Sequence, residues 1–218
     1  MTRVLTPFQE ELLRSIAPTE IGGAFYLTGG TALSAFYLHH RLSEDLDFFT
    51  SDPPAMSVVQ GRLTEIAGTL RAVVEYSRAY STFIDCVVTA NSGEMVRVDF
   101  AVDPAARLAP VERNPEYGIL LDNSLDIAGN KMSALFDRHE AKDFVDVFFI
   151  DRELYPFRDL LASARRKHIG MDNLWLAQSL RKVEAVSILP RMLKPLRPEE
   201  MKEFFLGWAA KLIDELKE

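Results

Sequence analysis

Two aspartates are spaced as metal ligands on a strand would be. Asp45 and Asp47 lie in the run 45–49, where polar and apolar residues alternate. Residues two apart on a strand project from the same face, so both carboxylates would point one way. Hard divalent cations prefer oxygen ligands of this kind. An Asp-x-Asp pair alone is not specific, because turns and strand ends also collect aspartates.

A third carboxylate strengthens the metal interpretation. Asp99 lies in another alternating run, on the side opposite Val98 and Phe100. If its strand neighbours the strand of Asp45, three carboxylates converge on one face. That much negative charge is costly unless a cation neutralises it. The alternative is an ordinary strand residue that faces solvent.

A glycine turn precedes the aspartate pair. Thr28-Gly29-Gly30-Thr31 joins a short apolar run to a stretch of helix-forming residues. Glycines let the backbone approach a phosphate, and the N–H groups at a helix start point toward an anion. The turn has neither a Walker A ending nor the dinucleotide fingerprint. It is therefore either a phosphate cradle or simply a tight connection from strand to helix.

These segments together resemble a known family, the AbiEii/AbiGii toxins, which are nucleotidyltransferases of polymerase-β-like fold. The segments similar to its four motifs are, in chain order, 27–33 with 41–49, Arg97-Val98-Asp99, 126–135 and 138–146. The resemblance covers residues 25–150, and residues 151–218 match no motif of this family. Four motifs in order are far more specific than any one of them.

The resemblance implies transfer of a nucleoside monophosphate from a nucleoside triphosphate to an acceptor hydroxyl. Asp45 and Asp47 would hold two Mg²⁺ ions and Asp99 would complete the site, where it could also accept the proton of the acceptor. The catalytic residues it implies are Asp45, Asp47, Asp99, Lys131 and Asp146. The substrate-binding residues it implies are Gly29, Gly30, Thr31, Arg41, Ser43 and Lys131, the last on the triphosphate. Arg41 could instead pair with Glu44 or Asp45 as part of the structure.

Helix geometry constrains the third and fourth motifs. On one straight helix, Lys131 and Asp146 would stand about 22 Å apart and could not serve one nucleotide. We therefore predict a break near His139-Glu140 that folds the second helix back, so that Asp146 approaches the site. The alternative is a structural Asp146 paired with Arg138 or Lys142.

Composition excludes several classes of protein. The chain has 218 residues, of which 48% are hydrophobic and 26% charged, and it is long enough to fold without disulfides. Cys86 is its single cysteine, which excludes a disulfide framework and a Cys-rich zinc module. No apolar run reaches the roughly 18 residues of a membrane helix, and the N-terminus has no apolar core of a signal peptide. We expect a cytoplasmic protein with no membrane contact.

The pattern along the chain predicts an α+β protein. Strands are expected at 24–28, 45–49, 72–80, 82–90 and 94–102, with a hairpin turn at Asn91-Ser92-Gly93, and helices at 7–17, 31–40 and 56–70. From Ser124 onward the pattern is almost wholly helical. We predict a nucleotidyltransferase domain with a mixed sheet and flanking helices over 1–120, and a helical domain packed on it over 121–218.

Charge and family point to the partners. The net charge is −7, yet residues 152–197 carry ten Lys and Arg against four Asp and Glu. This basic segment could contact an RNA backbone or form a solvated helical surface. The resemblance implies a toxin opposed by a separate antitoxin protein, with RNA, tRNA included, as the acceptor. Two alternatives are an Asp-x-Asp glycosyltransferase that uses a nucleotide sugar and a non-catalytic nucleotide-binding protein.

Overall fold

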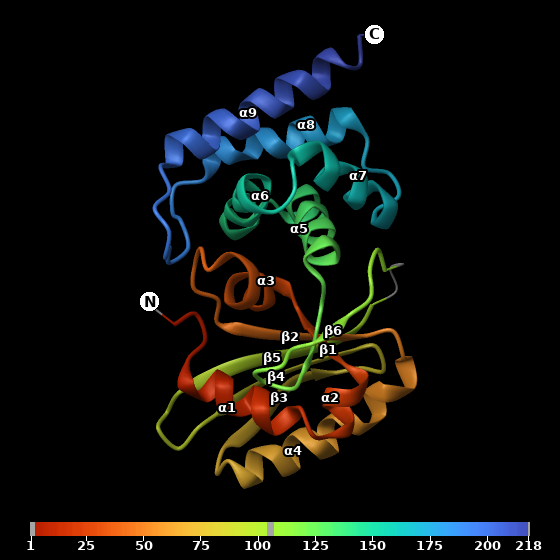
Figure 1. The fold of residues 1–218 in the computed structure, drawn as a ribbon, viewed down its shortest axis with the longest axis vertical. Helices are drawn as coiled ribbons and strands as arrows, with labels where there is room; N and C mark the ends of the chain where they lie inside the picture. The colour runs from red at the N-terminus through yellow and green to blue at the C-terminus, as the bar shows by residue number, and fades with distance from the viewer. Residues whose placement is uncertain (1–2, 104–106, 218) are drawn as a thin grey trace. The chain divides into compact units, whose positions relative to one another are not determined.

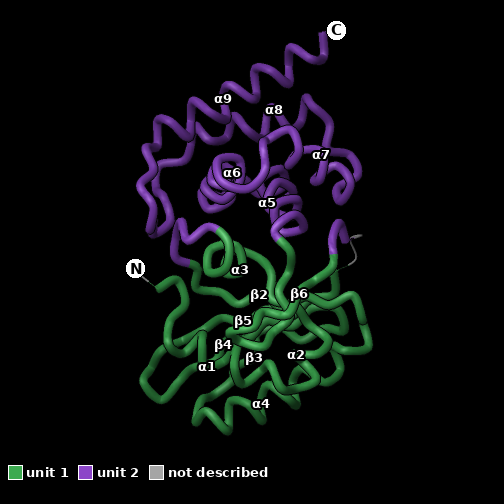
Figure 2. The backbone as a smooth tube through the Cα atoms, in the orientation of Figure 1, with its two compact units in different colours: residues 1–37, 43–105, 110–123 green, residues 38–42, 106–109, 124–218 purple. Residues whose placement is uncertain are grey.

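The computed structural model describes residues 3–103 and 107–217, which form two compact units. Unit 1 contains residues 3–37, 43–103 and 110–123, and unit 2 contains residues 38–42, 107–109 and 124–217 (Figure 2). Two short pieces of unit 2, 38–42 and 107–109, thus interrupt unit 1 in the sequence. Each unit is described by itself below.

Unit 1 is built on one mixed β-sheet. Within the described residues its seven strands lie in the order β3-β4-β5-β2-β1-β7-β6. Their bounds are β1 Tyr26–Thr28, β2 Asp45–Thr50, β3 Val73–Ala79, β4 Phe83–Thr89, β5 Met95–Val102, β6 Glu112–Arg113 and β7 Leu120–Leu121. β2 pairs with β5 in parallel and with β1 antiparallel, while β3, β4 and β5 are successive antiparallel neighbours.

The helices of unit 1 lie on both faces of this sheet. They are α1 Pro7–Ile16, α2 Glu20–Ala24, α3 Gly29–Leu33, the π-helical turn η1 Ser34–Leu38, the 3₁₀ turn η2 Pro53–Val58 and α4 Val59–Thr69. In Figure 1, α1, α2 and α4 lie on one side of the sheet and α3 on the other. The long helix expected at 31–40 is therefore two short pieces, the second of them π-helical.

Alternation of residue types decides which face of the sheet is apolar. Along β2, Leu46 and Phe48 are fully buried, and along β5 Val98 and Phe100 are as well. Phe100 stacks on Phe48 and meets Phe25 edge-on, with ring centroids 5.4 Å apart in each pair. Because side chains alternate along a strand, the aspartates between these residues point to the opposite face.

Unit 2 is helical. Its elements are α5 Ser124–Arg138, α6 Ala141–Glu153, α7 Phe157–Lys167, α8 Asn173–Arg181, the 3₁₀ turn η3 Lys182–Ala185 and α9 Pro198–Asp214. Aromatic residues of these helices form its core; Phe157 stacks on Trp208 with centroids 4.5 Å apart, and Phe144 meets Phe205 edge-on. The strap 38–42 is bound to this unit through backbone hydrogen bonds, among them Leu42 N to Arg191 O and Leu193 N to His40 O, each 2.8 Å.

The structure confirms the predicted α+β class, with a mixed sheet, flanking helices and a helical C-terminal region. The capping box of α1 forms as well, with Gln9 N donating to the Thr6 hydroxyl and Thr6 N to the Gln9 side chain. The predicted hairpin at 91–93 joins β4 to β5. None of the helices within 3–103 and 107–217 is both long and apolar enough to cross a membrane.

Candidate active site

Asp45, Asp47 and Asp99 lie on one face of the sheet, as their alternation predicts. β2 and β5 are parallel neighbours, and in their register Asp47 lies directly beside Asp99. Asp45 is two residues before Asp47 on β2 and therefore shares its face. All three side chains are half-buried. The three carboxylates were expected to converge if the strand of Asp99 neighbours the strand of Asp45, and the two strands are neighbours.

The Asp99 carboxylate lies in a region of high negative charge. Burial raises the pKa of Asp99 above its usual range, and the nearby carboxylates of Asp85 and Asp45 raise it further. Arg97 opposes this shift, because its Nε lies 3.1 Å from Asp99 Oδ1. The arginine two residues before Asp99 thus supplies positive charge at this position.

The three carboxylates do not form a closed ligand cluster. Among the described residues, no group of three or more His, Cys, Asp or Glu side chains is placed to hold a metal ion. Asp99 is instead turned to Arg97. The donor set nevertheless suits a hard divalent cation, since three carboxylates share one face and two of them are register neighbours on adjacent strands.

The glycine turn is shaped around Asp47. Gly29 has a φ of +72°, a left-handed backbone that favours glycine. A Cβ at this position would lie 2.0 Å from Asp47 Oδ2, far inside any real contact. The space beside the backbone of residue 29 is therefore filled by the Asp47 carboxylate. The glycine signal in the sequence has this physical reason in the structure.

The other residues expected near the phosphates lie beside this turn or at the start of β2. Gly30 and Thr31 are buried in α3, and the Thr31 hydroxyl donates to the backbone carbonyl of Asp45. This bond ties α3 to the first residue of β2. Ser43 is half-buried just before β2, where its carbonyl and that of Glu44 accept hydrogen bonds from the Gln9 side chain.

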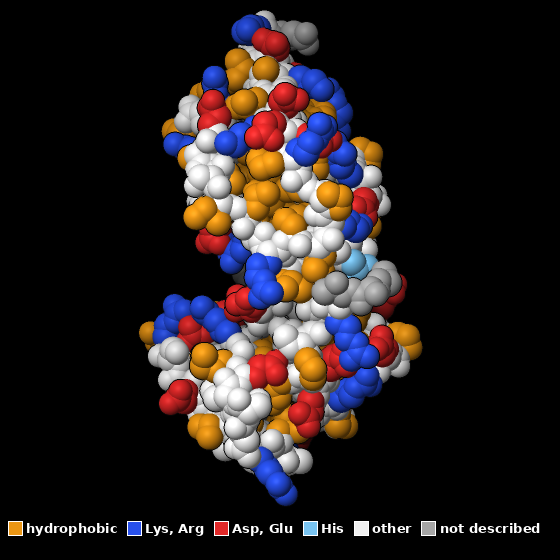
Figure 3. Space-filling model, turned by 90° about the vertical axis from the view of Figure 1, so that its left-hand side faces the viewer, with side chains coloured by type: hydrophobic (Ala, Val, Ile, Leu, Met, Phe, Trp, Pro, Cys, Tyr) orange, Lys and Arg blue, Asp and Glu red, His pale blue; other side chains and the backbone are white. Residues whose placement is uncertain are grey.

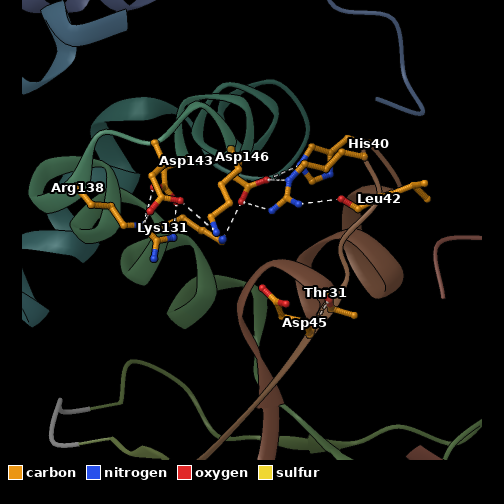
Figure 4. Close-up of polar contacts among 11 residues, drawn as sticks. Thr31, His40, Leu42, Asp45, Lys131, Arg138, Asp143 and Asp146 are labelled. Atoms are coloured by element: carbon orange, nitrogen blue, oxygen red, sulfur yellow. Dashed lines mark hydrogen bonds and ion pairs between the residues drawn. The ribbon is translucent and has the colours of Figure 1, made fainter. Parts of the chain in front are cut away.

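A second polar cluster is buried in unit 2, around Asp146 (Figure 4). The Asp146 side chain is fully buried and receives three partners. Arg41 binds it through two nitrogens, at 2.7 and 2.8 Å, and Lys131 Nζ and His40 Nε2 each lie 2.7 Å from its oxygens. The strap 38–42, α5 and α6 therefore meet at one carboxylate.

Charge keeps Asp146 ionised. Burial by itself would raise the pKa of Asp146, but Lys131 and Arg41 outweigh it and hold that pKa well below the usual range. Burial lowers the pKa of His40, against the opposing pull of Asp146, so its imidazole is neutral at pH 7. The cluster therefore joins a neutral histidine and two cations to one carboxylate.

The predicted break between α5 and α6 is confirmed. Arg138 ends α5, Ala141 begins α6, and His139 has a left-handed φ of +57°. Because the chain turns back there, Lys131 and Asp146 come within 2.7 Å of each other. On a single straight helix this contact would be out of reach.

The alternative partners expected for Asp146 are wrong. Arg138 binds Asp143 with two nitrogens, each at 2.8 Å, and Lys142 pairs with Glu140. Arg138 and Lys142 therefore pair with carboxylates near them in the sequence, around the turn between α5 and α6. Asp146 is instead bound by Lys131 of α5 and by His40 and Arg41 of the strap 38–42.

Sequence reasoning missed two features of unit 2. His40 was given no role in the sequence analysis, yet its Nε2 contacts Asp146 Oδ1. Asp126, at the start of α5, is fully buried and accepts hydrogen bonds from Leu108 N, Ala109 N and Lys167 Nζ. Asp126 lies inside the motif-like segment 126–135, whereas His40 lies outside all four segments.

Comparison with known proteins decides the family. The family described as "Nucleotidyl transferase AbiEii toxin, Type IV TA system" matches residues 11–214, nearly the whole chain. The chain belongs to the AbiEii nucleotidyltransferase toxin family. The resemblance predicted from the motifs is thereby confirmed.

Relatives of this AbiEii chain are distant in sequence. An uncharacterised protein of Aquifex aeolicus is 28% identical over 207 residues, which cover 93% of this chain and 95% of that protein. The crystal structure of JHP933 from Helicobacter pylori is similar with a TM-score of 0.59 at 19% identity, covering 95% of this chain and 89% of the other. MenT4, a nucleotidyltransferase toxin of Mycobacterium tuberculosis, gives a TM-score of 0.57 at 16% identity, covering 95% and 82%. At 19% and 16% identity, these two structures show similarity of fold alone.

Membership makes this AbiEii chain a nucleotidyltransferase and the toxin of a type IV toxin–antitoxin system. A nucleoside triphosphate is then its substrate and an antitoxin its partner. The glycosyltransferase and non-catalytic alternatives lose their support, because the family is one of nucleotidyltransferases.

Proposed function

We propose that this protein transfers a nucleoside monophosphate from a nucleoside triphosphate to a hydroxyl of an RNA acceptor, with two Mg²⁺ ions bound by Asp45, Asp47 and Asp99. The observation that carries the proposal is the placement of three carboxylates on one sheet face, with Gly29 shaped around one of them. Bound Mg²⁺ would orient the triphosphate and stabilise the oxygens of an in-line displacement.

Each residue of the sheet has a distinct role in this proposal. Asp45 and Asp47 hold the metal ions, and the left-handed turn at Gly29 leaves room for the Asp47 carboxylate. Gly30 and the rest of the turn bring backbone N–H groups to the phosphates, and Thr31 fixes α3 to the start of β2. Asp99, which lies directly beside Asp47 in the register of β2 and β5, is placed to accept the proton of the attacking hydroxyl.

The residues of unit 2 supply positive charge in this proposal. The resemblance to the family's third motif assigns Lys131 to the triphosphate, where its charge would offset the charge that develops as pyrophosphate leaves. Asp146 is a positioning residue, because it is fully buried and holds Lys131 and Arg41 in fixed places. Ser43 and Arg41 both precede β2 and position a phosphate or the strand itself, Arg41 while it is bound to Asp146.

The basic segment 152–197 lends limited support to an RNA acceptor. Many of its cations are already used: Lys167 is buried on Asp126, and Arg152 and Lys194 pair with glutamates. On the face drawn in Figure 3, red and blue side chains are interspersed. Arg181 and Lys182 remain exposed and could contact a phosphate backbone. The proposal of an RNA acceptor, tRNA included, therefore rests mainly on the family's toxin chemistry.

Nucleotidyl transfer is tested directly with labelled substrates. The protein is incubated with each α-labelled nucleoside triphosphate, Mg²⁺ and total RNA, and both label in RNA and released pyrophosphate are measured. We expect one molecule of pyrophosphate for each nucleotide incorporated, and loss of both with a metal chelator. Label that enters RNA equally well without divalent metal would contradict the metal site.

A matched pair of variants locates the chemistry. Asp47→Asn should abolish transfer and weaken metal binding while the melting temperature stays near that of the wild type. Asp52→Asn removes the same charge from an exposed position just beyond β2 and should leave transfer unchanged. Equal activity of the two variants would refute the assignment of Asp47.

A further inference from the structure

Two arginines lie on the same face of the sheet as the three aspartates. Arg97 lies on β5 and Arg78 on β3, and both reach Asp85 on β4 between them. Arg78 Nη2 is 2.6 Å and Arg97 Nη2 3.3 Å from the same oxygen, Asp85 Oδ2. Arg97 also contacts Asp99 through its Nε. The guanidinium groups thus form a row that begins at a candidate catalytic carboxylate.

A β-bulge turns Arg78 onto this face. Tyr76 is paired with Cys86, but the next pair is Arg78 with Asp85, so Ser77 is the extra residue. Asp85 is in turn paired with Asp99 in the antiparallel register of β4 and β5. Paired residues share a face, so Arg78, Asp85 and Asp99 all point the same way. Bulges often re-aim a side chain beside an active site.

The row has the chemistry of a phosphate site. Both guanidiniums are about half exposed, with 51% of the Arg78 side chain and 46% of the Arg97 side chain open to solvent. Their common anchor, Asp85, is only 7% exposed. Arg78 also lies over the ring of Phe83, 5.0 Å from its centroid. Carboxylates fix each guanidinium through its Nε and Nη2, and the edge formed by Nη1 and Nη2 is the one that can bind a phosphate through two nitrogens.

A purely structural ion-pair ladder explains this arrangement less well. Asp85 holds both arginines through Oδ2, while its Oδ1 is buried and makes no hydrogen bond among the described residues. A buried unsatisfied oxygen costs stability, and a ladder built for stability would use both oxygens. Charged residues on an edge strand such as β3 can also prevent edge-to-edge pairing of sheets. The test must separate this role of Arg78 from phosphate binding.

We propose that Arg78 and Arg97, with Phe83 beside them, bind the backbone phosphate of the acceptor RNA next to its reacting hydroxyl. This inference rests on the proposed function. Arg97 lies on the same strand as Asp99 and beside Asp45 in the register of β2 and β5, whereas Arg78 lies on β3, two strands farther from the glycine turn that follows β1. With the nucleoside triphosphate at the glycine turn, the acceptor approaches Asp99 from the side of β3 and β4, where Arg78 lies over the ring of Phe83.

The test compares Arg78→Gln with Arg62→Gln. Arg62 is a matched control, because it is 41% exposed and pairs with two carboxylates, Glu20 and Glu65, but lies on α4. Affinity for a 5′-fluorescein-labelled RNA and for total tRNA is measured by anisotropy over a salt series. Transfer kinetics are measured with the same RNA.

For Arg78→Gln we expect about a tenfold rise in Kd and in KM for RNA, the loss of one charged hydrogen bond. The slope of log K against log salt should fall by about 0.7, the value for one phosphate contact on a single strand. KM for the nucleoside triphosphate should stay unchanged, and Arg78→Lys should recover part of the loss. Arg62→Gln should match the wild type in every one of these quantities.

The outcomes separate this inference from the proposed function. If the wild type transfers nucleotide to RNA and Arg78→Gln keeps its KM and salt slope, the phosphate site is refuted and the row is a structural ladder. If the wild type binds RNA without transferring to it, the proposed function fails, while the binding data still decide on Arg78. Absence of both RNA binding and transfer in the wild type overturns both.

Discussion

Replacement of Gly29 by alanine tests whether the glycine turn exists to accommodate Asp47. The substitution has two separate effects in the structure. Alanine in a left-handed conformation costs about 1–2 kcal/mol, and the new Cβ would stand 2.0 Å from Asp47 Oδ2. Since real Cβ contacts are essentially never shorter than 3.0 Å, the carboxylate must move by about 1 Å or more. Misplacement of a catalytic group by about 1 Å can lower the rate about 100-fold.

Gly93 provides the control for the backbone effect. It has a φ of +85° in the turn between β4 and β5, and a Cβ there would meet no atom within 4 Å. Gly93→Ala therefore pays the left-handed backbone cost without any clash. Gly93→Ala should lose about 1–2 kcal/mol of stability, roughly 2–8 °C in melting temperature for a chain of this length. Gly29→Ala should lose at least as much, because its Cβ also displaces the Asp47 carboxylate.

Activity should separate the two variants. Nucleotidyl transfer and Mg²⁺ affinity are measured for each, at a temperature where both are folded by circular dichroism. We expect Gly29→Ala to lose about 100-fold in transfer rate and to bind Mg²⁺ more weakly, while Gly93→Ala keeps both near the wild-type values. Wild-type transfer by a folded Gly29→Ala protein would show that the position of Asp47 does not matter for the reaction.

Three further predictions concern buried groups. Asp146→Asn leaves Arg41 and Lys131 buried without their anion and should lower the free energy of unfolding by about 3–5 kcal/mol. Because the pKa of Asp146 is depressed in the folded state, its contribution to stability is present above the unfolded pKa near 4 and is lost as pH falls. The free energy of unfolding in urea should therefore depend less on pH in the variant than in the wild type between pH 7 and 3. His40 has a lowered pKa in the folded state, so the unfolded chain binds its proton more readily. The stability of the protein should therefore fall as pH drops below about 6.5. A His40→Gln variant whose melting temperature falls as steeply as that of the wild type between pH 7 and 5 would contradict this. Burial raises the pKa of Cys86 to about 12, so iodoacetamide at pH 8 should label it only after unfolding, as mass spectrometry can show.

Local features of this protein could be predicted from the sequence because they depend on short-range rules. The alternation around Asp99 predicted which way its side chain points, and the turn residues 91–93 predicted the β4–β5 hairpin. The distance between Lys131 and Asp146 along a helix predicted a break near 139, where the backbone is left-handed. Each inference required only the period of a strand or helix, or the chemistry of one turn.

Other features were decided only by tertiary structure. No local pattern specifies that β5 pairs in parallel with β2, and that pairing sets Asp99 beside Asp47. Likewise, Arg41 and Asp146 are 105 residues apart in the chain, yet two of their hydrogen bonds are shorter than 3 Å. The residue types and their spacing therefore established which groups could do chemistry. Strand order and helix packing, which depend on burial of the whole apolar surface, decided which of those groups meet.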